Sequence, residues 1–75
     1  SLVFYVNGVA EKRSSGRSIR LQVKDNDVIE VSGAEHNGIA ILRITSVSDN
    51  MTVPEPGKLI YVNNNLVMID RVRLK

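Results

Sequence analysis

The sequence contains no cysteine and only one histidine, His36, so it can form neither disulfides nor thiolate metal sites. One imidazole cannot build the usual four-ligand zinc site. Disulfides cannot supplement the core of this 75-residue chain. A domain of this size buries only about 60% of the surface that its unfolded chain exposes. We therefore expect a small domain without a cofactor and without a metal.

Long apolar runs are also missing, and so are most aromatic residues. No apolar run approaches the roughly 18–20 residues that span a membrane, and residues 2–6 lack the basic lead-in of a signal peptide. Phe4, Tyr5 and Tyr61 are the only aromatic residues, which leaves few platforms for stacking nucleic-acid bases. We expect no membrane span and a single β domain over residues 1–75. Because the chain begins directly on an apolar strand, this domain is compatible with excision from a larger protein.

What the sequence does contain is a period-two pattern of apolar and β-branched residues, with no helical periodicity. Asn7-Gly8 is a strong signal for a two-residue hairpin turn, because both residues tolerate a positive φ. Further turns are predicted at residues 25–27, 36–38 and 63–65. The pattern predicts an all-β fold, a small sandwich or partly open barrel of six to seven short antiparallel strands.

The alternation also predicts where individual strands lie. Residues 18–24 should be a strand with Ile19, Leu21 and Val23 inward and polar residues outward, which suits a sheet with one wet face. Residues 39–47 carry apolar side chains on both faces, which favours a strand whose first half is buried on both sides. Residues 48–57 contain Pro54 and Pro56 and should be the one extended irregular loop.

The C-terminal part should form a last hairpin from residues 58–62 and 66–75. Near Asp70 the apolar residues change from one face of the strand to the other, which indicates a β-bulge. Residues 2–6 and 67–74, the first and last strands, are the natural sheet edges. Such edges can pair with a partner chain or with a second copy of this chain, so the sequence is also compatible with a homodimer formed through edge strands.

Charge is distributed unevenly although the net charge is only +2. Residues 1–24 carry five basic residues against one acidic residue, residues 25–57 carry six acidic residues against Arg43, and residues 58–75 carry four basic residues against Asp70. The stretch EKRSSGRSIR is the densest basic segment, but it lacks the spacing of a phosphate-binding loop. A solvated basic turn explains it without a ligand. The candidate interaction residues at the two basic ends are Lys12, Arg13, Arg17, Arg20, Arg71, Arg73 and Lys75.

Catalytic chemistry has little support in the sequence. His36 lies in the turn sequence EHNG, and no nucleophile elbow accompanies it. Asp25 and Asp27 could offer oxygen atoms to calcium, but acidic residues in turns also bind their own backbone. Asn50 starts an Asn-Met-Thr pattern for N-glycosylation in a loop. We expect a domain that is not an enzyme.

A resemblance covers residues 5–48, where Val6-Asn7-Gly8, Ile29, Val31 and Asn37-Gly38 mark strand ends and turns. This pattern resembles the bacterial immunoglobulin-like modules that accompany secreted glycosidases and surface proteins, which implies a β-sandwich. The same stretch is similar to the end of a forkhead-associated domain and to the β half of a small RNA-binding domain of a ribosomal protein and pseudouridine synthases. The phosphopeptide motif of the first and the RNA-contacting helices of the second are absent, so only the β architecture transfers.

Together these observations predict a non-catalytic structural or protein-interaction module of a larger assembly or multidomain protein. Its contacts should run through sheet edges, through the loops Ser14–Arg17 and Ser48–Gly57, or through an apolar patch of Met51, Val53 and Leu59. The alternative is a small basic nucleic-acid-binding β-barrel, which requires the two basic ends of the chain to share one face.

Overall fold

The computed structural model describes all residues, 1–75, and contains eight short strands. No segment forms a helix long and apolar enough to cross a membrane. The prediction of an all-β fold is confirmed. The strands are β1 (Leu2–Val6), β2 (Val9–Ser14), β3 (Val28–Ser32), β4 (Ile39–Arg43), β5 (Met51–Val53), β6 (Leu59–Asn63), β7 (Leu66–Arg71) and β8 (Arg73–Leu74).

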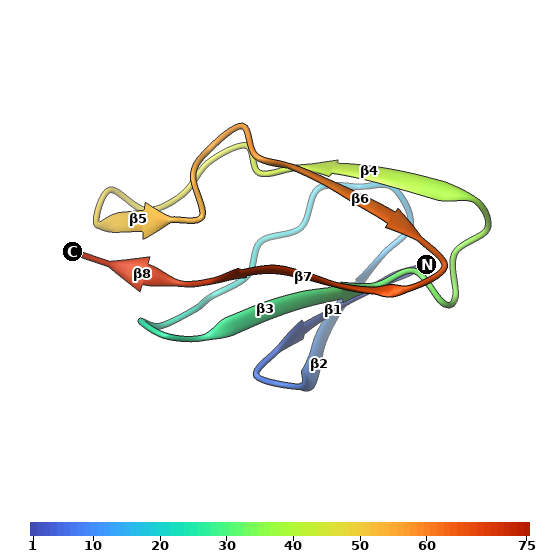
Figure 1. Ribbon diagram of the computed structural model, residues 1–75, viewed down its shortest axis with the longest axis horizontal. Coiled ribbons are helices and arrows are strands. Elements are labelled where there is room, and N and C mark those ends of the chain that lie inside the picture. Colours follow the sequence, from blue (N-terminus) through green and yellow to red (C-terminus); the bar gives the residue numbers. More distant parts are fainter.

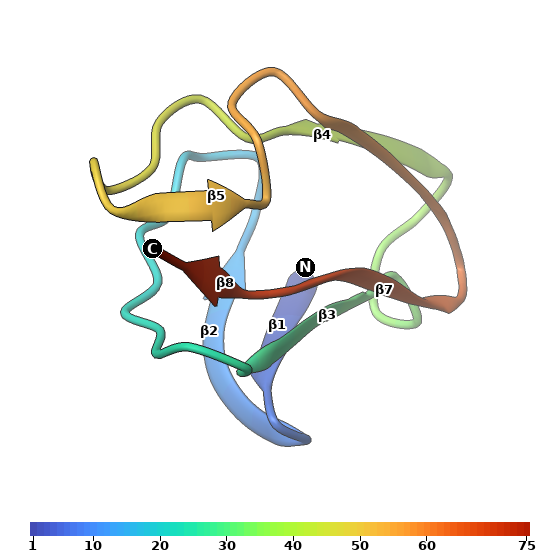
Figure 2. The ribbon, with the colours of Figure 1, turned by 60° about the vertical axis from the view of Figure 1, so that its left-hand side comes forward.

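The strands form three antiparallel sheets. The largest has the order β2-β1-β3-β7, and the other two are the pairs β4–β6 and β5–β8. In Figure 1 the β4–β6 pair lies above β3 and β7, so the two layers face each other. Figure 2 shows the β5–β8 pair at one side of these layers, beside the C-terminus.

The hydrophobic core fills the space between the two layers. Side chains on one face of each strand point inward because successive residues of a strand alternate between its faces. Val31 and Val72 are fully buried, and the partly buried Ala40 and Leu42 of β4 pack against the same cluster. The eight buried core residues are Leu2, Phe4, Ile29, Val31, Ile60, Val62, Ile69 and Val72.

Two local predictions are confirmed. Asn7 and Gly8 have φ values of 52° and 82°, and Val6 pairs with Val9 across them, as a type I′ hairpin requires. A bulge lies near Asp70: β3 pairs with Met68 and then with Asp70, which leaves Ile69 as the extra residue. The hairpin turn is specified by two residues next to one another in sequence, whereas the bulge involves the pairing of β7 with β3.

Residues 18–24 do not form the predicted strand. Ile19, Leu21 and Val23 do pack against the core, so the predicted inward face is correct. However, residues 15–23 take part in no strand pairing and in none of the backbone hydrogen bonds outside the strands. The inward side chains of this segment cover one side of the core, but its extended backbone is unpaired and belongs to no sheet. The prediction was wrong because alternation reports which side chains are buried and not whether the backbone is paired.

The predicted last hairpin is also wrong. The strands on either side of the turn at Asn64 belong to different layers, since β6 pairs with β4 and β7 pairs with β3. The side-chain amide of Asn65 accepts a hydrogen bond from the Asn63 N–H, and its carbonyl accepts one from Gly33. These bonds fix a corner where the chain passes from one layer to the other.

Two expectations about edges and loops need correction. The first strand, β1, lies between β2 and β3 and is not an edge, whereas β7 is an edge as predicted. The loop Ser48–Gly57 is not wholly irregular, because Met51–Val53 forms β5 and pairs with β8. Pro54 directly follows β5, in keeping with the exclusion of proline from paired strand interiors.

Candidate functional site

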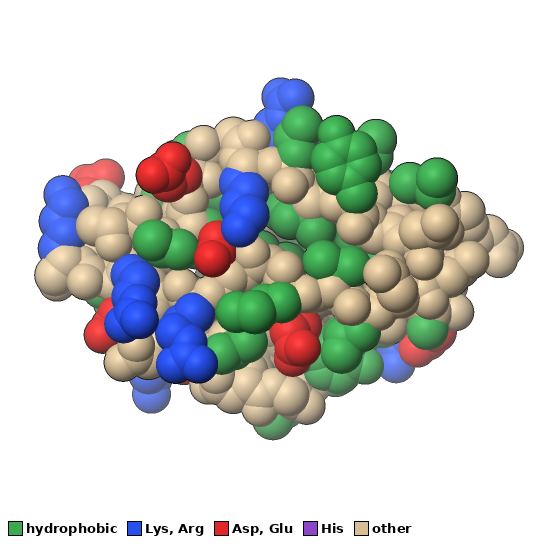
Figure 3. Space-filling model, viewed as in Figure 1, with side chains coloured by type: hydrophobic (Ala, Val, Ile, Leu, Met, Phe, Trp, Pro, Cys, Tyr) green, Lys and Arg blue, Asp and Glu red, His purple; other side chains and the backbone are tan.

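The most exposed apolar surface lies on the outer face of the β4–β6 pair. Four large apolar side chains point outward there, and their exposed fractions are 66% for Ile39, 62% for Ile41, 61% for Tyr61 and 43% for Leu59. We call this surface, formed by Ile39, Ile41, Arg43, Leu59, Tyr61 and Asn63, the β4–β6 face. Figure 3 shows hydrophobic side chains gathered over β4 and β6 in the upper part of the view.

The strand register explains why these side chains form one patch. Ile41 pairs with Tyr61 and Arg43 pairs with Leu59, which places their Cβ atoms about 5 Å apart on the same side of the sheet. The intervening residues of both strands point into the core instead. The prediction that the first half of residues 39–47 is buried on both sides was therefore wrong. The domain has only two layers, and nothing covers the outside of β4.

One charged residue, Arg43, belongs to the β4–β6 face. Its side chain is exposed and makes no hydrogen bond and no ion pair. The structure has two ion pairs, Arg13–Glu35 and Lys58–Asp70, and both lie elsewhere. Exposed apolar residues scattered singly are ordinary in proteins, whereas large contiguous apolar patches are a feature of interaction sites. The β4–β6 face can thus bury apolar surface and offer a free guanidinium group to the same ligand.

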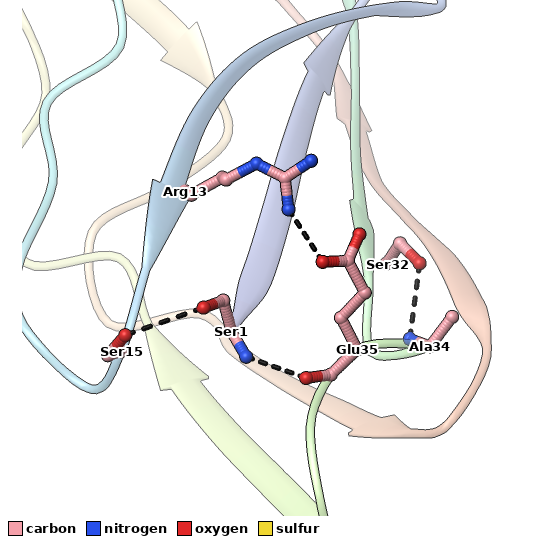
Figure 4. A network of polar contacts seen from close by, with 6 residues as sticks. All are labelled: Ser1, Arg13, Ser15, Ser32, Ala34 and Glu35. Atoms are coloured by element: carbon pink, nitrogen blue, oxygen red, sulfur yellow. Dashed lines mark hydrogen bonds and ion pairs between the residues drawn. The ribbon is translucent and has the colours of Figure 1, made fainter.

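The basic residues of the N-terminal part do not form one cluster. Lys12 and Arg20 line an open pocket of about 260 Å³ together with Leu21. Arg13 instead reaches across β1 to Glu35, as Figure 4 shows, and forms an ion pair in which Nη1 and Oε1 are 2.7 Å apart. The predicted contact loop is held closed by Ser14, whose hydroxyl donates to the carbonyl of Arg17 at 2.6 Å and accepts from its N–H at 3.2 Å.

Some basic residues from the two ends of the chain lie on opposite edge strands of the four-stranded sheet. Lys12 and Arg13 are on β2, and Arg71 is on β7, with β1 and β3 between them. At the usual strand spacing the two outer strands are about 14 Å apart. Arg73 donates from Nη1 to the side-chain oxygen of Asn26 at 2.9 Å, and the backbone N–H of Lys75 is bound to Asn50. The structure does not bring the seven predicted basic residues together.

The second predicted contact loop, Ser48–Gly57, borders another open pocket. Its volume is about 530 Å³, and its lining includes Val53, Pro56 and Lys58. The Lys58 ammonium donates to the carbonyl of Ile69 at 2.8 Å and to the carboxylate of Asp70 at 2.7 Å, so it links the two layers beside this pocket. Lys58 and Asp70 thus pair with each other, whereas Glu55, which also lines this pocket, has no ion-pair partner.

The acidic residues of the turn at 25–27 make structural hydrogen bonds. Oδ1 of Asp25 accepts from the N–H of Leu74 at 2.9 Å. The carboxylate of Asp27 accepts from the N–H of Lys24 at 2.7 Å and from the Asn7 side chain at 2.8 Å, and these two bonds, in that order, lower the pKa of Asp27. No group of three histidine or acidic residues is placed to hold a metal ion. His36 is half-buried in the turn before β4, where its N–H donates to Gly33.

The sequence reasoning missed most of the β4–β6 face. The predicted apolar patch contained Leu59, which is on the face, but also Met51 and Val53, which are half-buried, and Met51 packs against the core. The run IAILR carries apolar residues at both parities, but the same pattern fits a strand between two layers, so it does not single out an exposed face. No protein-family model matches this sequence, and neither a curated protein nor a solved structure gives a match.

Proposed function

We propose that this domain is a non-catalytic protein-interaction module that docks a partner protein through the β4–β6 face. The observation that carries the proposal is the set of four large apolar side chains on one sheet face, each at least 43% exposed. Two of these residues, Ile41 and Tyr61, are cross-strand neighbours at the centre of the face. A partner that covers them removes contiguous apolar surface from water, which is the main favourable contribution to most protein association.

The exposed apolar residues are not needed to build the fold. The inward residues of β4 and β6 already fill their side of the core, and polar β-branched residues would serve the outer positions equally well as strand formers. An apolar face that the fold does not require is the feature expected of a docking surface. The predicted resemblance to immunoglobulin-like modules stays a prediction, and the docking proposal does not depend on it.

Magnitudes suggest that the apolar contacts alone give weak binding. Complete burial of the exposed part of one such side chain contributes about 1–2 kcal/mol, so the four together supply roughly 4–8 kcal/mol. Association costs on the order of 4–15 kcal/mol in lost translational and rotational freedom. A useful affinity therefore needs further contacts. The nucleic-acid alternative has less support, because it requires basic residues from both ends of the chain on one surface.

Selection of binders from a phage-displayed random peptide library tests the proposal. Peptides selected on the immobilised domain should bind the double variant Ile41→Thr/Tyr61→Thr at least about tenfold more weakly, since two central contacts are lost. Val9→Thr and Leu66→Thr are matched controls, because Val9 and Leu66 are similarly exposed but lie on the other sheet. The proposal is wrong if the selected peptides bind the double variant as well as they bind the original domain. A selection that yields no binder also counts against it.

A further inference from the structure

Arg43 is the residue of the β4–β6 face whose chemistry restricts the partner most. It is the last residue of β4 and lies two positions beyond Ile41 on the same side of the strand. Its cross-strand neighbour is Leu59, so apolar side chains lie beside it along the strand and across it. A partner that covers Ile41 and Leu59 therefore also lies beside Arg43 and can take its guanidinium group out of water.

A covered guanidinium needs an acceptor. Arginine has five N–H donors and keeps its positive charge at any physiological pH, so it cannot lose the charge when water is removed. Within the domain the Arg43 side chain has no hydrogen-bond or ion-pair partner. A carboxylate is the group that matches the planar donor pattern best, since it can accept two parallel N–H bonds. A partner without an acceptor at this place leaves the charge unpaired and is disfavoured.

A second copy of this chain fits the β4–β6 face poorly as the occupant. Two copies related by a twofold axis would bring identical β4–β6 faces together. Each face carries the positive charge of Arg43 and no acidic residue, and its other polar groups, the Asn63 amide and the Tyr61 hydroxyl, are uncharged. Self-pairing would thus bury two guanidinium groups and supply no carboxylate. The charge of the face fits a different protein better than it fits itself.

Strand geometry also fixes where the carboxylate must lie. Alternate residues of a strand are about 6.8 Å apart, so Arg43 lies about this distance from Ile41 along β4. An extended partner segment has the same repeat. A segment with an apolar residue over Ile41 then reaches Arg43 with the residue two positions further along its own chain.

The geometry points to a partner segment that places an apolar side chain over Ile41 and Tyr61 and, two residues away, an aspartate or glutamate on Arg43. This inference rests on the proposed docking function of the β4–β6 face. It adds the chemical class of the partner, an apolar and acidic protein segment in an extended conformation. The ion pair between Arg43 and the partner's carboxylate would then supply the specificity, because apolar side chains of many kinds can cover Ile41 and Tyr61.

The test is a parallel selection of the random peptide library on the original domain and on Arg43→Glu. Peptides selected on the original domain should be enriched in Asp or Glu two positions from an apolar residue. Replacement of that acid by its amide, or Arg43→Gln in the domain, should weaken binding about tenfold, as expected for loss of one charge-assisted contact. Arg43→Glu should select Lys or Arg at the same position. Thermal unfolding of each variant verifies that it is folded.

Arg20→Glu is the matched control, because Arg20 is also exposed but lies outside the β4–β6 face and should leave the selected sequences unchanged. Peptides that need Ile41 and Tyr61 but bind Arg43→Gln unchanged would overturn this inference and leave the docking function standing. Peptides that need neither Ile41 nor Tyr61 would overturn both. Sedimentation velocity supplies the remaining outcome: a dimer that dissociates in Ile41→Thr/Tyr61→Thr would make a second copy the occupant and overturn the inference.

Discussion

The side chains of Asn7 and Asp27 are hydrogen-bonded to each other, with Nδ2 of Asn7 donating to Oδ1 of Asp27 over 2.8 Å. Asn7 also binds Val28 twice, because its side-chain oxygen accepts from the Val28 N–H and its own N–H donates to the Val28 carbonyl. The turn that contains Asp27 also binds the C-terminal part of the chain. The backbone carbonyl of Asp27 accepts a hydrogen bond from the Val72 N–H at 2.7 Å. One polar contact thus joins the first hairpin to the turn that holds the end of the chain.

The Asp27 carboxylate should make folding stability sensitive to acid. The Lys24 N–H and then the Asn7 amide stabilise the charged form, so the pKa of Asp27 in the folded domain lies below its ordinary value of 3.8. The unfolded chain takes up this proton at a higher pH than the folded domain. The stabilisation is therefore present above about pH 4 and is lost as the pH falls through the folded-state pKa.

The variant Asp27→Asn should remove this part of the pH dependence. Urea unfolding midpoints, measured between about pH 2 and pH 6, should fall less steeply in Asp27→Asn than in the original domain, and the variant should be less stable near neutral pH. Asp49→Asn is the control, because Asp49 is exposed and accepts no hydrogen bond in the structure. Equal acid sensitivity in Asp27→Asn and the original domain would contradict the assigned role.

Val62 lies so close to Gly33 that there is no space for a side chain at position 33. A Cβ atom at Gly33 would lie 2.5 Å from Cγ1 of Val62 and 3.3 Å from the backbone nitrogen of Asn64. Val62 is 1% exposed and β-branched, so it cannot turn away from the added methyl group. We expect Gly33→Ala to lower the free energy of unfolding by about 1–3 kcal/mol through overpacking.

A double-mutant cycle with Val62→Ala isolates this contact. Val62→Ala alone should be destabilising because it leaves a cavity, but the added methyl group of Gly33→Ala should partly fill the space. The double variant should then be more stable than the sum of the two single effects, by about 0.5–3 kcal/mol of coupling. Denaturant unfolding measures all four proteins. Additive effects would mean that the two residues do not compete for one space.

The sequence predicts local features, such as turns, that depend on neighbouring residues. It predicts poorly which strands are paired and which strand faces are covered, because these depend on how the layers of the fold are arranged. The turn at Asn7-Gly8 was predicted because both residues adopt positive φ, and this preference is a property of the residues themselves. Residues 18–24 were misassigned because a paired strand and an unpaired extended segment show the same alternation of inward and outward side chains. The absence of hydrogen-bond partners for that segment depends on the rest of the fold.

The candidate site shows the same division. Exposure of the basic residues follows from their type, and all seven predicted basic residues are exposed. The exposure of Ile39 and Ile41 does not follow from type, because a run of apolar residues is equally compatible with a strand between two layers. Only the observed pairing, in which β4 contacts one sheet neighbour and covers one core, leaves its outer face open. A site of this kind is found from topology rather than from a motif.

Arg13 and Val3 provide a third prediction, on what a surface ion pair contributes. Val3 is 2% exposed although its strand neighbours on either side are Arg13 and Ser32, and the Arg13 side chain reaches across β1 toward Glu35 (Figure 4). The Arg13–Glu35 pair is itself more than half exposed, so its charge contribution should be at most about 1 kcal/mol. We infer that the aliphatic stem of Arg13 stabilises the domain by covering Val3.

Three substitutions separate packing from charge at this place. Arg13→Ala should lower the free energy of unfolding by about 1 kcal/mol, whereas Arg13→Met should cost clearly less because it keeps an unbranched apolar stem. Glu35→Ala, which removes the charge partner and leaves the stem, should resemble Arg13→Met. Urea unfolding at low and high salt measures these effects. If Arg13→Met is as unstable as Arg13→Ala, and the loss disappears at high salt, the ion pair and not the packing is responsible.

The basic stretch EKRSSGRSIR raises the question of nucleic-acid binding, and the salt dependence of binding can answer it. Each phosphate contact with a single strand contributes about −0.7 to the slope of log K against log salt. Lys12 and Arg20 line one pocket, while Arg71 is on the opposite edge strand, β7, and Arg73 is on β8 in a different sheet. We therefore expect weak binding of labelled single-stranded oligonucleotides, measured by fluorescence anisotropy, with a slope near −1.4 from two contacts.

Two double variants locate those contacts. Lys12→Ala/Arg20→Ala should abolish the weak binding, whereas Arg71→Ala/Arg73→Ala should leave it nearly unchanged, because Lys12 and Arg20 line one pocket and Arg71 and Arg73 do not. Seven residues that acted as one surface would instead give a slope of about −5, and both double variants would then weaken binding similarly. A slope of that size would make the basic residues a single interface. The β4–β6 face would then no longer be the leading candidate for the binding surface of this domain.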